Sequence, residues 1–147
     1  MAITPNHVGY RGYVTCRPFG GLCIPVPVQA LVLRDYCARN GYMYKLHANE
    51  NIFPNSYMVL EGMINELDQF EGLLATSMFM MPKRPERRRL IYDGVLAHGA
   101  ALHFVLEDFV IRTAPDIEPV EEILSIHGLL AAAPTTISDE NAASAGE

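Results

Sequence analysis

Cysteine is scarce in this chain of 147 residues, which has only three cysteines and no CxxC pair. An odd number without metal-ligand spacing argues against both a disulfide framework and a zinc site. Long apolar runs are missing too, because no segment reaches the ~20 apolar residues that a membrane-spanning helix needs. Residues 1–13 contain no apolar run typical of a signal peptide. These absences predict a cytoplasmic protein with reduced thiols and no membrane partner.

Basic residues are also few, with 11 lysines and arginines against 17 acidic residues, a formal net charge of -6 and a pI near 5.3. A protein of this charge should bind duplex DNA poorly, so no nucleic-acid partner is expected. Several of the basic residues gather in residues 83–89. That run is either a phosphate-binding segment or, more commonly, the solvated start of a helix.

Hydrophobic residues make up half of the chain, which is enough for one globular domain of ordinary size. We expect a single α/β domain over residues 1–132. The end of the chain, residues 133–147, is small, polar and acidic, and is predicted to be a disordered tail.

Apolar periodicity and turn residues predict strands that alternate with helices. The strands are expected at residues 12–16, 43–47, 72–78 and 101–106, and the helices at 27–40, 54–67, 85–99 and 119–132. In the first helix, Val28, Leu31, Val32 and Tyr36 recur on one face, which predicts the side that packs on the sheet. The alternation favours a three-layer α/β fold with a mainly parallel four-stranded sheet in the order 2-1-3-4, resolvase-like or flavodoxin-like.

Three segments resemble the catalytic domain of serine recombinases (resolvases), in the same order and with similar spacing. These segments are residues 12–17, 29–41 and 85–105. In this alignment Thr15 takes the arginine place and Arg17 the serine place of the Tyr-x-Arg-Val-Ser motif of that family. Phosphoryl transfer needs an activated nucleophile and preorganised cations, so no DNA cleavage or strand exchange is expected.

A second resemblance, to the small proteins of the sporadic carbohydrate cluster family, covers most of the chain. It is carried by Arg11-Gly12-Tyr13, Arg17-Pro18, the Arg-Asp-Tyr-Cys of residues 34–37, Pro54-Asn55-Ser56-Tyr57-Met58 and His103 to Glu107. Cys16 stands where that pattern has serine. This resemblance implies a setting in carbohydrate biosynthesis.

The candidate site lies beyond the carboxyl ends of the strands, where ligands bind in open parallel sheets. Acid/base groups and a thiol there are predicted to be catalytic: Glu50, Tyr57, Cys16, His47 and Glu107. The residues predicted to bind substrate are Arg17, Asn49, Asn55, Ser56 and Ser77. Neither a metal nor a cofactor is expected.

Structural roles compete with these functional ones. Cys16 is more often a small buried apolar residue than a nucleophile. Arg17 and Glu50 form a structural ion pair about as often as a site. Tyr57 lies on an apolar helix face and is more commonly part of the core. His103 alternates inward on its strand, which favours a structural role.

Two functions remain open from the sequence. The first is an enzyme performing isomerisation, epimerisation or elimination on a sugar phosphate or nucleotide sugar. The second is a non-catalytic module, derived from a resolvase-like fold, that binds a ligand or a partner. The apolar stretch at residues 123–130 predicts a homodimer or higher homo-oligomer. The recombinase resemblance also implies pairing through a helix in this region.

Overall fold

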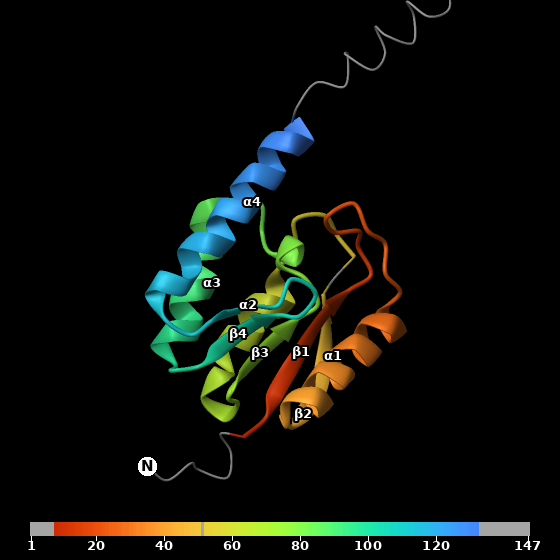
Figure 1. Cartoon of the computed structure of the whole chain (residues 1–147), viewed down its shortest axis with the longest axis vertical. Helices are drawn as coiled ribbons and strands as arrows, with labels where there is room; N and C mark the ends of the chain where they lie inside the picture. Colours follow the sequence, from red (N-terminus) through yellow and green to blue (C-terminus); the bar gives the residue numbers. More distant parts are fainter. Residues whose placement is uncertain (1–7, 51, 133–147) are drawn as a thin grey trace, which may run out of the picture.

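Strands and α-helices alternate along residues 8–50 and 52–132, the part of the chain that the computed structural model describes (Figure 1). The elements are β1 (Tyr10–Thr15), α1 (Val26–Asn40), β2 (Tyr44–Glu50), α2 (Met58–Asn65), β3 (Gly72–Ala75), α3 (Pro85–Ala97), β4 (Ala101–Phe104), β5 (Phe109–Ile111) and α4 (Ile117–Ala132). Short 3-10 turns occur at η1 (Leu67–Gln69), η2 (Met78–Met80) and η3 (Ala114–Asp116). The predicted tail, residues 133–147, lies outside the described residues.

The strands form one sheet in the order β2-β1-β3-β4-β5, with the first four parallel and β5 antiparallel to β4. This confirms the predicted α/β class and the order of the first four strands. The predicted number of strands is one too low, because β5 was not anticipated. β5 has three residues and follows a tight turn in which Asp108 adopts a positive φ of 57°. A strand this short shows no alternation that a sequence pattern can reveal.

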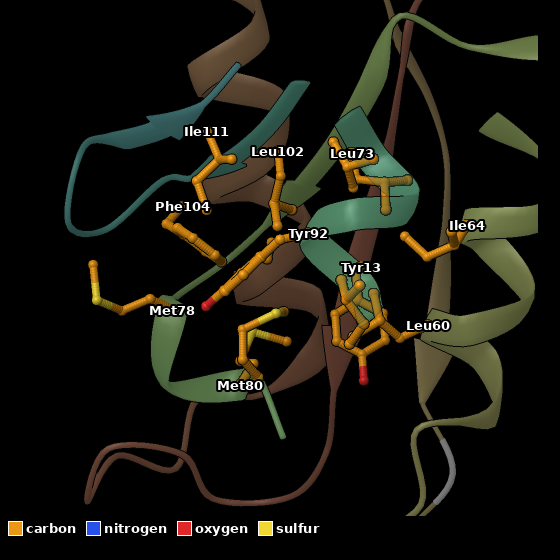
Figure 2. Packing of buried hydrophobic residues seen from close by; sticks show 14 of the residues in the cluster. Tyr13, Leu60, Ile64, Leu73, Met78, Met80, Tyr92, Leu102, Phe104 and Ile111 are labelled. Carbon is orange, nitrogen blue, oxygen red and sulfur yellow. The ribbon is translucent and has the colours of Figure 1, made fainter. Parts of the chain in front are cut away.

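Helices cover both faces of the sheet and create two hydrophobic cores (Figure 1). The larger core lies between the sheet and the helices α2, α3 and α4, and contains Tyr13, Leu73 and Phe104 from the strands (Figure 2). The smaller core lies between the sheet and α1, and contains Val14 and Leu74. Neighbouring residues on β1 and β3 therefore face opposite cores, as the pleat of a strand requires.

The predicted inner face of α1 is wrong in part. Tyr36 is buried, but Val28 and Leu31 are exposed and Val32 is half-buried. The residues that α1 does bury are Gln29, Ala30, Leu33, Tyr36 and Cys37. The helix is therefore rotated from the expected face, and its buried side begins with a polar residue, Gln29, in the first turn.

Gln29 is fully buried because its side-chain amide is hydrogen-bonded on both sides. Its nitrogen donates to the carbonyls of Thr15 and Ile24, at 2.6 and 2.7 Å. Its oxygen accepts from the Thr15 N–H and the Thr76 hydroxyl, both at 3.2 Å. A buried amide satisfied in this way stabilises the fold. It also fixes the loop that follows β1 against the end of β3.

The last helix, α4, packs mainly through its first half, and in its second half the ring of His127 still contacts Phe79, with centroids 4.4 Å apart. Ile117 and Val120 belong to the larger core, whereas the second half extends past the body of the domain (Figure 1). There Ile126, Leu129 and Leu130 are 57%, 71% and 70% exposed. Within residues 8–50 and 52–132, no helix has the length and apolar character needed to cross a membrane.

Candidate functional site

Two arginines lie on the ring of Tyr57 at the carboxyl edge of the sheet. The guanidinium carbons of Arg17, from the loop after β1, and of Arg87, from α3, are 4.9 and 5.0 Å from the ring centroid. Arg17 also donates to the Phe53 carbonyl at 2.8 Å, and Arg87 donates to the Asn55 carbonyl at 3.0 Å. We call these five residues the Tyr57 cluster. It joins three segments that are distant in sequence.

Glu50 anchors the start of α2. Its carboxylate, at the end of β2, is buried and accepts from the Tyr13 hydroxyl at 2.8 Å. It also accepts from the N–H groups of Val59 and Leu60 at 3.3 and 3.2 Å. No side chain at the N-cap position of α2 does this. A carboxylate at a helix N-terminus is stabilised by the free N–H groups and by the helix dipole.

The surroundings of Glu50 also shift the pKa values of two neighbouring tyrosines, Tyr13 and Tyr57. Burial raises the pKa of Tyr13, and the hydrogen bond to Glu50 raises it further. Burial raises the pKa of Tyr57 as well, against the lowering effect of Arg17 and Arg87. Both phenols therefore stay protonated at neutral pH and act as hydrogen-bonding and packing groups.

Ser77 and Glu107 form a second group, at the ends of β3 and β4. The Ser77 hydroxyl and the Met78 N–H donate to the two carboxylate oxygens of Glu107, both at 2.7 Å. The Ser77 oxygen in turn accepts from the Phe79 N–H at 3.1 Å. These bonds cap the short turn η2. β3 ends at Ala75, so the strand predicted at 72–78 is three residues too long.

The other predicted site residues are spread around the edge. Cys16 and Asn49 are exposed, so the expectation that Cys16 is a buried apolar residue is wrong. Ser56 is half-buried in the loop before α2. Asn55 has a positive φ of 63° in that loop. His47 lies on the α1 side of the sheet. A Cβ atom on Gly12 would point to this side, where it would meet Leu33 of α1 at 2.8 Å and the Cβ of His47 at 3.0 Å.

The structure thus joins Arg17, Glu50, Asn55 and Tyr57 in one neighbourhood and Ser77 with Glu107 in another. Sequence reasoning missed Arg87, which lies on a helix and not at a strand end. Its signal was the basic run at residues 83–89. Within that run Lys83, Arg84 and Arg89 are exposed, as expected of a solvated helix start.

His103 has the structural role that its inward position predicted. It is fully buried, and its Nδ1 lies 2.7 Å from the Tyr36 hydroxyl. The ring stands edge-on to Tyr10, with centroids 5.0 Å apart. Burial, followed by the nearby charge of Arg112, lowers the pKa of His103 to about 4, while Asp108 opposes this shift.

The low pKa of His103 predicts a loss of stability in mild acid. The unfolded chain protonates this histidine near pH 6.5, whereas the folded chain does so only near pH 4. The neutral form is the one that the fold favours, so stability is full above pH 6.5 and falls as the pH drops towards 4. Between pH 7 and pH 5 the free energy of unfolding should fall by about 2 kcal/mol through this group.

Urea unfolding of His103→Gln at both pH values measures this contribution, with His127→Gln as the control. His127 is an exposed histidine on α4. The difference between pH 7 and pH 5 should shrink by about 2 kcal/mol in His103→Gln and stay unchanged in His127→Gln. An equal difference in all three proteins would contradict the assignment.

The sheet order and the helices on both faces define a resolvase-like α/β fold. In particular, the chain is similar to the crystal structure of the N-terminal catalytic domain of TP901-1 integrase. The TM-score is 0.59 and the sequence identity 14%, over 83% of this chain and 96% of that domain. At this identity the likeness establishes the fold alone. No protein-family model matches the chain, and no curated protein does.

These comparisons correct the functional expectation. A role in carbohydrate biosynthesis, with acid/base chemistry on a sugar phosphate or nucleotide sugar, is wrong. The matching solved structure is a catalytic domain of an integrase, and no family match supports the sporadic carbohydrate cluster resemblance. Several residues of the motifs that carried this resemblance have structural roles. Tyr57 and His103 are buried, and Glu107 caps η2.

Proposed function

We propose that this protein is a non-catalytic binding module with a resolvase-like fold, and that it acts by assembling with protein chains through α4. Self-association is the simplest form of this function, because each copy supplies both partner surfaces. The resolvase-like fold is compatible with such a role, since function depends on the site and not on the fold.

The apolar stripe along the second half of α4 supports assembly. Ile126, Leu129 and Leu130 follow an i, i+3, i+4 spacing and therefore lie on one side of the helix. Burying one large aliphatic side chain stabilises a complex by roughly 1.5–3 kcal/mol before the cost of association. A contiguous exposed apolar stripe is typical of a protein interface.

The bonding of the polar residues at the sheet edge supports the non-catalytic part of the proposal. Glu50 and Glu107, the carboxylates best placed for acid/base chemistry, hold backbone N–H groups of α2 and η2. At the motif position of the recombinase serine, Arg17 lies against Tyr57. The position of the motif arginine is held by Thr15, whose hydroxyl accepts from the Arg17 N–H at 3.1 Å.

Leu129→Glu tests the proposal, because it places a charge in the centre of the stripe. Light scattering on the wild-type chain should give at least twice the monomer mass of 16.3 kDa, and Leu129→Glu should give the monomer mass. Leu46→Glu is the matched control, since Leu46 is 78% exposed on β2, away from α4. A monomeric wild-type chain, or assembly unaffected by Leu129→Glu, would refute self-association through α4.

A further inference from the structure

A second exposed apolar surface lies at the carboxyl edge of the sheet. Ile52, Phe53 and Met58 are 69%, 70% and 72% exposed and belong to one short segment between β2 and the start of α2. Arg17 donates to the Phe53 carbonyl, and Arg87 reaches the same segment at Asn55. We call Ile52, Phe53, Met58, Arg17 and Arg87 the 52–58 surface.

The 52–58 surface has two arginines, Arg17 and Arg87, in a protein whose formal net charge is -6. Arg87 is paired with Glu61, with Nη2 and Oε1 2.6 Å apart. Arg17 donates to a neutral carbonyl and lies on a neutral ring. Lys83 and Arg84, which precede α3, are exposed. A partner for this surface should therefore be apolar and acidic.

α4 has this chemistry: exposed Glu118 and Glu122 in its first half are followed by the apolar stripe of its second half, while Glu121 is paired with Arg88. A shallow hollow along α4 is lined by Glu118, Glu121, Glu122, Ser125 and Ile126. Glu122 and Ile126 are four residues apart, so the exposed acid continues the line of the apolar stripe. One chain thus exposes an apolar acidic helix and an apolar basic surface, and both lack a covering element among the described residues.

We propose that α4 of one copy docks on the 52–58 surface of a second copy. This inference rests on the proposed function, self-assembly through α4, and names the surface that receives the helix. Pairing α4 with α4 would bring two acidic helices together and leave the 52–58 surface uncovered. Docking on the 52–58 surface covers both apolar areas and brings opposite charges together. Reciprocal exchange closes a dimer, whereas one-way docking gives a ring if the rotation closes and a filament if it does not.

Complementation between two variants tests this docking. Met58→Glu removes the receiving surface and keeps α4, whereas Leu129→Glu removes the helix stripe and keeps the receiving surface. Glutamate in the first turn of α2 is compatible with the helix dipole, so Met58→Glu should fold. Each variant alone should self-associate roughly 10- to 100-fold more weakly than the wild-type chain. Phe53→Asp is a second variant of the receiving surface.

Mixing Met58→Glu with Leu129→Glu should restore association, because the mixture contains one intact helix and one intact surface. Differently tagged full-length chains, followed by analytical ultracentrifugation, detect this mixed complex. A mixture that stays monomeric overturns the docking. If Met58→Glu and Phe53→Asp assemble like the wild type while Leu129→Glu does not, the docking is wrong and assembly through α4 stands. A monomeric wild-type chain overturns both proposals.

Discussion

Replacing Gly72 with alanine should destabilise this protein more than any other single methyl group added to its sheet. A Cβ atom at Gly72 would lie 2.1 Å from the Ala101 carbonyl oxygen and 2.9 Å from a ring carbon of Tyr10. Gly72 pairs with both of these residues, from β1 on one side and β4 on the other. Backbone on a paired strand has no room to move, so β3 and β4 must separate.

We expect the Gly72→Ala free energy of unfolding to fall by about 3 kcal/mol or more, at the upper end of overpacking effects. Urea denaturation or the soluble yield measures this loss. Gly62→Ala is the matched control, because no heavy atom lies within 4 Å of a Cβ at that position in α2. Because alanine favours a helix interior more than glycine does, Gly62→Ala should raise the free energy of unfolding by about 1 kcal/mol. Equal stability of Gly72→Ala and the wild type would show that the strands are not packed as described.

Glu121→Gln should strongly destabilise the fold, because it removes the carboxylate that pairs with a buried arginine. The guanidinium of Arg88 is bound by both oxygens of Glu121, at 2.8 and 2.9 Å, and the Tyr92 hydroxyl donates to the same carboxylate at 2.8 Å. Arg88 is only 7% exposed. Burial alone would raise the pKa of Glu121, but the bonds from Arg88 and Tyr92 hold it below its usual value.

In Glu121→Gln the Arg88 charge remains buried with only neutral acceptors, the carbonyls of Pro82 and Lys83 and the one amide oxygen that the substitution keeps. Removing one member of a buried pair typically costs about 3–5 kcal/mol, and we expect about 3 because Glu121 is partly exposed. Thermal or urea unfolding measures the loss. Glu122→Gln, an exposed neighbour on the same helix, should change stability by less than about 0.5 kcal/mol. Similar losses in both variants would mean that the pair contributes little.

The sequence predicted the order of four strands because long apolar patterns and glycine or proline boundaries report the sheet directly. It failed where structure depends on contacts made elsewhere. The inner face of α1 includes Gln29, whose burial depends on an acceptor in β1 and on the hydroxyl of Thr76. An apolar periodicity cannot identify a polar residue that is buried because residues elsewhere in the chain satisfy its hydrogen bonds.

The candidate site shows the same limit. The rule that ligands bind beyond the strand ends placed Arg17, Glu50 and Tyr57 in one region, and the structure brings them together. The rule could not reveal that Glu50 is closed onto the backbone of α2. It could not find Arg87 either, since a helix residue reaches the edge only through the packing of α3 against α2.

The half-packed α4 has a consequence for how its last turns form. An isolated helix of about eight residues is unstable in water because its nucleus is costly, and Gly128 weakens this segment further. The packed turns around Val120, held by Arg88 and Glu121, supply that nucleus. The remaining turns therefore form by extending an existing helix and need no nucleation of their own. Their helicity depends on what covers Leu129 and Leu130, so contact with a partner and ordering of the helix end become one thermodynamic step.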